Sequence, residues 1–169
     1  TLMKCIAGII PFEGEILVCG VANDQKNMLK YRRIINYGEA EPAYPEFMKG
    51  NDLIEFYKNI RHAKTEQVEN LVKKFGVDKF QMKEIGTYSS GMKKKLSLAL
   101  AFIGSPQLIL LDEPLITLDK ETTDIVLHLI SEYASKNVSV IFTSHQEFKD
   151  KLTIPLHHLV INQHQLNLL

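Results

Sequence analysis

The chain of 169 residues lacks several features that would assign it to a class at once. Twenty Lys and Arg residues balance twenty Asp and Glu residues, so no net basic field would attract nucleic acid or an acidic membrane face. The longest purely apolar runs, such as Leu108–Leu111, are far shorter than the ~20 residues of a membrane span. The two cysteines, Cys5 and Cys19, both lie in apolar segments, which indicates a reduced cytoplasmic protein rather than a disulfide scaffold.

The beginning of the chain also lacks an expected feature. It opens on Thr1-Leu2-Met3 without an initiator Met, and no signal-peptide pattern is present. We therefore expect that a segment upstream has been removed or left out. The 19.3 kDa that remain, with 45% apolar residues, are enough for one domain with a core, which argues against disorder.

Hydrophobic periodicity and turn residues predict alternating helices and strands. Gly38–Gly50 contains Pro42 and Pro45 and is predicted to be a loop. The expected helices are 1–10, two amphipathic segments within 51–83, Ser89 or Ser90 to Ile103, Lys120 to about Lys136, and a short one at 147–152. The expected strands are 14–20, 33–37, the buried runs 108–111 and 138–142, and one or two edge strands within 156–169. This alternation predicts an α/β domain with a parallel core sheet.

The strand at Leu108–Leu111 is followed by two carboxylates, Asp112 and Glu113. Open α/β sheets bind ligands at the carboxyl ends of their strands. In nucleotide hydrolases the first Asp of such a pair helps to hold Mg²⁺, and the adjacent Glu can orient or polarise the attacking water. The alternative is an acidic pair that caps the next turn. Pro114 and the later Leu118-Asp119 favour the hydrolase interpretation.

About twenty residues upstream, Tyr88-Ser89-Ser90-Gly91-Met92 opens a helix. Small residues at a helix start leave backbone N–H groups accessible to an anion such as phosphate. By itself, Ser89 fits a simple capping role better. The following Lys93–Lys95 is predicted to be a solvated helix face.

The strand at 138–142 leads through Thr143-Ser144 to His145. This places an imidazole at the same sheet edge as Asp112 and Glu113, where it could sense a γ-phosphate. The other histidines near the end of the chain, His157, His158 and His164, lie in a polar tail and are expected at the surface.

Taken in order and spacing, the signature helix, the Walker B strand, the Leu-Asp turn and the switch His resemble the ATP-binding subunit of an ABC transporter. The resemblance covers nearly the whole chain. It implies a P-loop NTPase (RecA-like) core lobe, residues 1–50 and 105–169, and an inserted α-helical subdomain, residues 51–104, within one nucleotide-binding domain of residues 1–169. It also implies a homo- or heterodimer with a second such domain, with ATP bound between the two.

The resemblance implies roles for individual residues. Asp112 would assist Mg²⁺, Glu113 would be the catalytic carboxylate and His145 the switch residue. Asp119 would lie at the dimer seam. The signature residues that would reach the γ-phosphate of the partner's ATP are Ser89, Ser90 and Gly91.

The family's G-x-x-x-x-G-K-[ST] phosphate loop is absent from this sequence. Thr1-Leu2-Met3-Lys4 resembles the segment directly after the Lys of that loop, so about 30–40 residues would be missing, including the loop itself. Thr1 would be the Mg²⁺-binding hydroxyl or the residue after it. We expect a polypeptide of only these 169 residues to bind ATP poorly and to hydrolyse little.

Two further motifs depart from the pattern. The signature has Ser90 in place of the first Gly and Met92 in place of Gln, and a Gly-Met followed by basic residues resembles exporter-type subunits. In the loop that carries a Gln or Glu to the metal, Ala40 takes that position, and Glu39 or Glu41 could serve after a shift of one residue.

The leading hypothesis is an ATPase that energises a membrane permease, peripheral on the inner face of the cell membrane, with no nucleic-acid partner. The helical subdomain and the loop Glu39–Met48 would form the docking surface, unless Tyr44, Phe47 and Met48 pack inward. One alternative is a soluble ABC-type ATPase that is not coupled to a membrane. The other is a nucleotide-incompetent fragment used for assembly or regulation, which the intact Asp112-Glu113 pair and His145 argue against.

Overall fold

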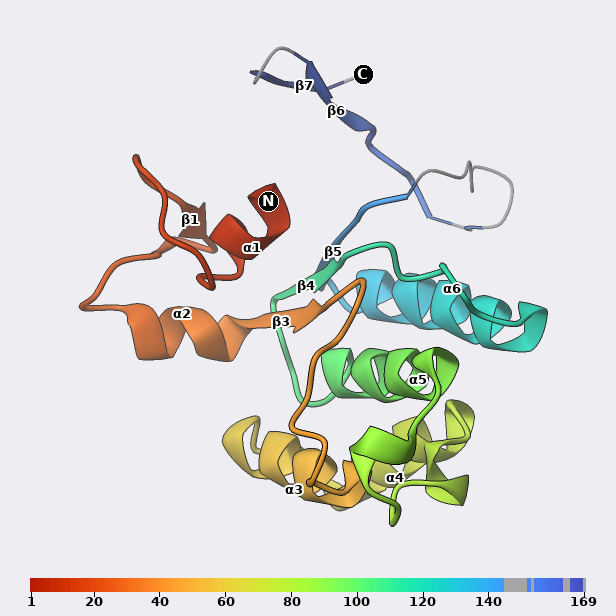
Figure 1. Ribbon diagram of the computed structural model, residues 1–169. Helices are drawn as coiled ribbons and strands as arrows, with labels where there is room; N and C mark the ends of the chain where they lie inside the picture. Colours follow the sequence, from red (N-terminus) through yellow and green to blue (C-terminus); the bar gives the residue numbers. More distant parts are fainter. Residues whose placement is uncertain (145–151, 153, 163–164, 169) are drawn as a thin grey trace.

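A parallel sheet of three strands lies at the centre of the computed structural model, which describes residues 1–144, 152, 154–162 and 165–168 (Figure 1). The strands are β3 (Ile35–Gly38), β4 (Leu108–Leu111) and β5 (Ser139–Phe142), with β4 in the middle. In the register of the sheet, Gly38, Leu111 and Phe142 are paired. The three strands therefore end side by side at the carboxyl edge of the sheet.

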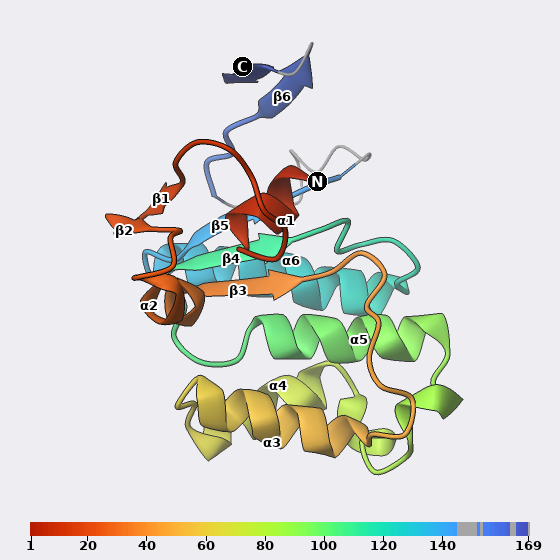
Figure 2. The ribbon, with the colours of Figure 1, turned by 60° about the vertical axis from the view of Figure 1, so that its left-hand side comes forward.

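The two faces of the sheet are covered by different helices (Figure 2). Successive residues of a strand point to opposite faces, so Leu108 and Leu110 share one cluster with Met3 and Tyr31. Ile109 and Leu111 belong to the larger cluster on the opposite face. The covering elements are α1 (Leu2–Ile6) and α2 (Met28–Ile34) on the first face, and α5 (Ser90–Ala101) and α6 (Lys120–Ser135) on the second.

Two helices pack on the side of α5 that faces away from the sheet (Figures 1 and 2). They are α3 (Gly50–Ile60) and α4 (Thr65–Lys74), followed by the 3₁₀ turns η1 (Val77–Lys79) and η2 (Ile85–Thr87). Apolar residues at helical spacing, such as Leu53 with Ile54 and Val68 with Leu71, form their buried faces. Their packing against α5 extends the larger cluster from the sheet outward.

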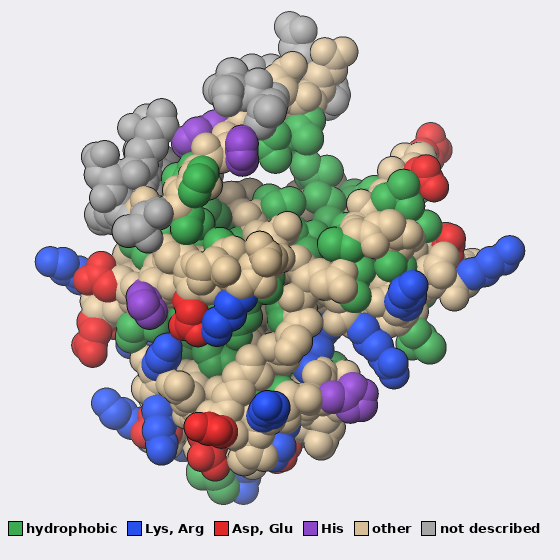
Figure 3. Space-filling view, turned by 180° about the vertical axis from the view of Figure 1, so that it is seen from behind, with side chains coloured by type: hydrophobic (Ala, Val, Ile, Leu, Met, Phe, Trp, Pro, Cys, Tyr) green, Lys and Arg blue, Asp and Glu red, His purple; other side chains and the backbone are tan. Residues whose placement is uncertain are grey.

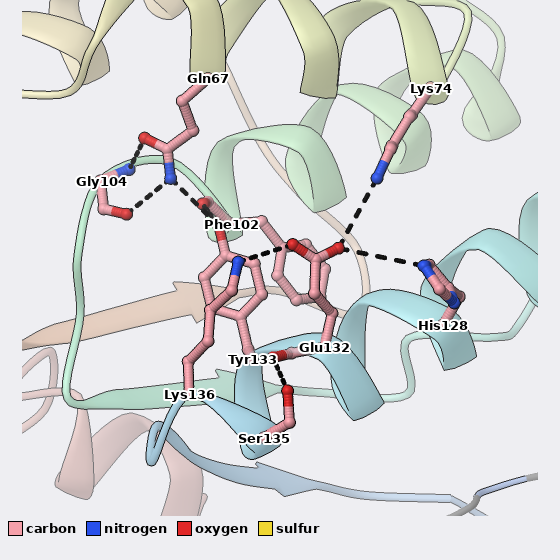
Figure 4. A network of polar contacts seen from close by, with 9 residues as sticks. All are labelled: Gln67, Lys74, Phe102, Gly104, His128, Glu132, Tyr133, Ser135 and Lys136. Carbon is pink, nitrogen blue, oxygen red and sulfur yellow. Dashed lines mark hydrogen bonds and ion pairs between the residues drawn. The ribbon is translucent and has the colours of Figure 1, made fainter.

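Buried polar contacts fix these layers to one another. The amide of Asn36 on β3 donates to the carbonyl oxygens of Ala101 and Ile103, both at 2.8 Å, and so holds the end of α5 against the sheet. Gln67 on α4 exchanges hydrogen bonds with the backbone of Gly104 and donates to the hydroxyl of Tyr133 on α6. Figure 4 shows this network, in which Glu132 of α6 also lies 3.6 Å from Lys74 of α4.

The expected elements of the middle of the chain are confirmed, but the N-terminal segment differs. The strand predicted at 14–20 is only β1 (Leu17–Val18), and it pairs antiparallel with β2 (Val21–Ala22), which the sequence did not predict. Cys19 and Gly20 form the turn between them with positive φ, and Cys19 is exposed although apolar residues precede it in the sequence. Both cysteines are free thiols. Helix α2 was also missed, and it shifts the predicted strand 33–37 to Ile35–Gly38.

The C-terminal part corrects two further expectations. Strand β5 was predicted to be buried, but Ser139 is exposed and the next three residues are half-buried, because within the described residues β5 is an outer strand of the sheet. The tail strands β6 (Leu159–Asn162) and β7 (Gln165–Leu168) pair with each other and not with the core sheet. The helix predicted at 147–152 falls almost wholly outside the described residues. His157 and His158 are exposed as predicted, while His164 is not described.

The surface agrees with the balanced composition. Figure 3 shows acidic and basic side chains interspersed over the face seen from behind, with hydrophobic groups between them. Among the described residues, none of the helices is long and apolar enough to cross a bilayer.

Candidate functional site

The carboxylate pair lies where the chain leaves the central strand. The N–H group of Asp112 donates to the carbonyl oxygen of Gly38 at 2.8 Å, which continues the β3–β4 pairing by one residue. Glu113 then turns sharply with a φ of 44° and is followed by Pro114. A left-handed backbone at a residue with a Cβ costs roughly 1–2 kcal/mol. The surrounding contacts must therefore stabilise this turn, which is a common property of functional sites.

Thr143, directly after β5, supplies one of those contacts. Its hydroxyl donates to Oδ1 of Asp112 at 2.7 Å and accepts the backbone N–H of Glu113 at 2.8 Å. The N–H of Thr143 is itself held by the carbonyl oxygen of Leu111 at 3.0 Å. One hydroxyl thus fixes the carboxylate of Asp112 and the backbone of Glu113 relative to the sheet.

Tyr37 on β3 approaches Asp112 from the other side. Its hydroxyl lies 3.4 Å from Oδ2 of Asp112, a long and therefore weak contact. Burial, and then the negative charge of Asp112, raise the pKa of Tyr37 well above its usual value. The phenol consequently stays protonated, and its hydroxyl is the donor in the contact with Asp112.

Lys94 of α5 contacts the backbone of Asp112. The prediction that Lys93–Lys95 form a solvated helix face is wrong for Lys94, which is buried. Its side chain is 3% exposed, and its ammonium donates to the carbonyl oxygens of Glu39 (3.0 Å), Ala40 (3.1 Å) and Asp112 (3.2 Å). Burial lowers the pKa of Lys94 to about 8, while the charges of Asp112 and Glu113 oppose this shift.

The signature residues begin helix α5. Ser89 is its N-cap and accepts the N–H of Met92 at 3.2 Å, and Ser90 and Gly91 form the first turn. A Cβ placed on Gly91 would lie 3.9 Å from the carbonyl oxygen of Thr117, so this turn lies beside the segment that follows Pro114.

Asp119 is bound within the same segment. It caps α6 by accepting the N–H of Thr122 at 2.7 Å, and it forms a 2.8 Å ion pair with Lys95 of α5. The hydrogen bonds from Lys95 and then Thr122 hold the pKa of Asp119 well below its usual range. Asp119 therefore links the start of α6 to the signature helix.

The remaining candidates occupy the edges of this region. Thr1 is exposed at the N-cap position of α1, and Lys4 of that helix lies 4.0 Å from the carboxylate of Glu39. Glu41 is exposed in the loop after β3. His145 lies outside the described residues, so the structure does not place the predicted switch residue.

Sequence reasoning missed Lys94, Thr143 and Tyr37. The signal for Lys94 was present, because positions 94, 97, 98 and 101 form one helical face whose other members are small or apolar. Thr143 follows a strand of the same parallel sheet as Asp112, which by itself would bring the two together once the pairing is known.

The carboxylate of Asp112 suits a metal ion that is bound together with a phosphate group. No group of three or more His, Cys, Asp or Glu side chains that could hold an ion occurs within the part of the chain that the structure describes. Mg²⁺ binds characteristically through one or two carboxylates together with phosphate oxygens. Asp112, with Oδ2 in only a long contact, fits that mode.

Comparison with known proteins shows the family of the chain. The profile of the family described as "ABC transporter" matches residues 1–116. The chain belongs to the ABC transporter family. Over 150 residues it is 29% identical to the ABC transporter ATP-binding protein NatA of Bacillus subtilis and 30% identical to the human glucosylceramide transporter ABCA12.

These relatives are longer than the chain. Each alignment covers 86% of the chain but only 61% of NatA and 6% of ABCA12. A solved dimeric structure of the ATP-binding cassette MJ0796, in a post-hydrolysis state with ADP and Pi, matches with a TM-score of 0.74 at 18% identity, over 86% of this chain and 68% of that one. The likeness shows that this family member has the fold of a P-loop NTPase domain, an α/β fold with a parallel sheet.

Thr143 should contribute to stability through its hydroxyl. Thr143→Val keeps the shape of the side chain but removes both hydrogen bonds, and we expect the free energy of unfolding to fall by about 1–3 kcal/mol because two polar groups lose their partner. Thr143→Ser keeps the hydroxyl and should lose much less. Urea denaturation measures both, and equal losses in the two variants would contradict the bridging role.

Asp119 should stabilise α6 in a pH-dependent way. Asp119→Ala removes the cap and should lower the free energy of unfolding by about 1 kcal/mol. Asp119→Asn keeps a capping oxygen but cannot ionise. Because the pKa of Asp119 is depressed on folding, the stabilisation by its charge is complete above the unfolded pKa near ~4 and is lost as pH falls through the lower folded pKa. Denaturation curves of wild type and Asp119→Asn should therefore converge in acid, and a constant difference would contradict this assignment.

Proposed function

We propose that this chain is the ATP-binding and ATP-hydrolysing part of a transporter and that it energises a membrane permease. The observation that carries the proposal is the Asp112-Glu113 pair at the carboxyl end of β4, held in a strained turn by Thr143 and Lys94. Membership of the ABC transporter family supports the same chemistry. A pair of carboxylates that served only as a cap would not require this support.

The proposed roles follow from the geometry of the pair. Asp112 would hold Mg²⁺ through Oδ2, with the hydroxyl of Thr1 and the carboxylate of Glu39 or Glu41 as further oxygen donors. When bound, Mg²⁺ neutralises charge on the phosphates. Glu113 would orient the attacking water and accept its proton. His145 would contact the γ-phosphate.

We propose that a second nucleotide-binding domain, identical or homologous, completes the site. Ser89, Ser90 and Gly91 would contact the ATP held by that partner, and Asp119 would lie at the seam. The dimeric state of the MJ0796 cassette supports this arrangement. In the proposed division, residues 51–104 are a helical subdomain and residues 1–50 and 105–169 a core lobe.

The permease would dock in a groove beside the outer edge of β3. The cavity there has a volume of about 680 Å³, and its lining residues include Tyr44, Tyr57, Ile60 and Arg61. In the loop after β3, Tyr44 and Met48 are half-buried against the core. Phe47 of the same loop is 80% exposed. A short amphipathic helix of a permease would suit a groove that both apolar and arginine side chains line.

The direction of transport that we propose is export, which rests on the Gly91-Met92 signature followed by lysines. The corresponding location is the cytoplasmic face of the cell membrane, through the permease. A protein that hydrolyses ATP but never binds a membrane subunit would instead support the soluble ABC-type alternative.

Glu113→Gln tests the catalytic assignment in the full-length protein. The amide has nearly the same shape but cannot accept a proton, so we expect ATP hydrolysis to fall by about 100-fold or more while ATP binding is kept. Phosphate release and calorimetry measure the two quantities. Glu121→Gln, on the exposed first turn of α6, is the matched control and should leave the rate unchanged.

The outcomes separate the hypotheses. A full-length wild-type protein without ATP binding would support the nucleotide-incompetent alternative. Full hydrolysis in Glu113→Gln would contradict the role of Glu113.

Phe47→Ala combined with Ile60→Ser tests the docking surface. Both side chains are exposed, so the fold should persist, and we expect less permease to co-purify with the double variant because apolar contact area is lost. Leu17→Ala removes an exposed apolar side chain on β1 as a control. Undiminished co-purification of the double variant would place the docking surface elsewhere.

A further inference from the structure

Lys94 is a charged side chain that is buried on a helix of the core, which is unusual. Removing a charged amine from water costs several kcal/mol, and three neutral carbonyl oxygens compensate for it only in part. A Met or Leu side chain would fill the same space without a buried charge, but it would leave the three carbonyl oxygens without this donor. The lysine is therefore retained for the backbone groups that it joins, and not for its packing.

The carbonyl groups that Lys94 binds belong to the two segments that directly follow β3 and β4. Glu39 and Ala40 begin the loop that leads to Tyr44 and Phe47, and Asp112 is the first carboxylate of the pair. Lys94 itself belongs to α5, one turn after the signature residues. Three segments that are distant in sequence thus meet at a single atom, Nζ.

The same loop contacts α5 at a second point. Ser97, one turn after Lys94, forms a side-chain hydrogen bond with Tyr44, and both residues line the groove. Farther along, the loop is held by backbone hydrogen bonds from Gly86 to Glu46 and from Ile85 to Met48. A helix that entered the groove would press on a loop that is fixed at both ends, and its first fixed point is the ammonium of Lys94.

We propose that Lys94 is a positioning residue that transmits docking at the groove to the Asp112-Glu113 pair. An inward displacement of Glu39 and Ala40 changes the bonds of the ammonium to their carbonyl groups, and the third bond passes this change to the backbone of Asp112. The hydroxyl of Thr143 then carries the displacement to Glu113. This inference rests on the proposed ATPase and permease functions.

Lys94→Met tests the link in the full-length protein, compared alone and with its permease bound in detergent, with Mg-ATP as the substrate. We expect kcat of the permease-bound protein to fall about tenfold, while KM for ATP changes less than about twofold, because ATP binding does not use Lys94. The ratio of kcat with and without permease should fall toward one. Lys94→Arg keeps a buried charge with several donors and should restore part of that ratio.

Lys93→Met is the matched control, because it makes the same substitution one position earlier in α5 and should keep the wild-type ratio. If Lys94→Met does not fold, Lys94→Gln retains two donors and should give an intermediate ratio. An unchanged ratio in Lys94→Met or Lys94→Gln, or an equal loss of kcat with and without permease, would overturn the positioning role. Absence of permease-stimulated hydrolysis in wild type would instead overturn the proposed function on which this inference rests.

Discussion

The parallel pairing of β4 with β3 and β5 is the constraint on which the rest of the structure depends. The register pairs Gly38 with Leu111 and Leu111 with Phe142. The residues that follow the three strands therefore lie next to one another at the carboxyl edge of the sheet. Asp112 meets Thr143 there, and Glu39 lies close enough to share a lysine with Asp112. A shift of one residue in either pairing would separate these groups and turn the apolar residues of the strand to the wrong faces.

Packing of α5 against the sheet places one charged side chain, that of Lys94, within the core. α5 lies against Ile109 and Leu111 with an almost wholly apolar face, and Asn36 fixes its end. Two polar side chains, Lys94 and Ser97, are buried on α5, and Lys94 binds the carbonyl groups that follow the ends of β3 and β4. Since three carbonyl groups of the two segments that follow β3 and β4 need donors at this point, a lysine satisfies them together at the cost of a buried charge.

Family membership and geometry support each other but answer different questions. The relatives show the family, and the chain spans only 61% of NatA and 6% of ABCA12. The geometry adds which neighbours hold the pair and how the loop after β3 reaches it. The proposed coupling through Lys94 arises from the second kind of information.

By itself the sequence determined the α/β class, the parallel core and the strand that delivers Asp112 and Glu113, because long periodic segments and a continuous apolar run are local signals. The sequence alone did not predict α2 or the β1–β2 hairpin, whose short elements depend on packing against the sheet. Only the tertiary structure decided that Lys94 binds the backbone of Asp112 and that Thr143 holds the carboxylate of Asp112. Both facts depend on contacts between segments 18 and 31 residues apart, which strand register creates and local pattern does not encode.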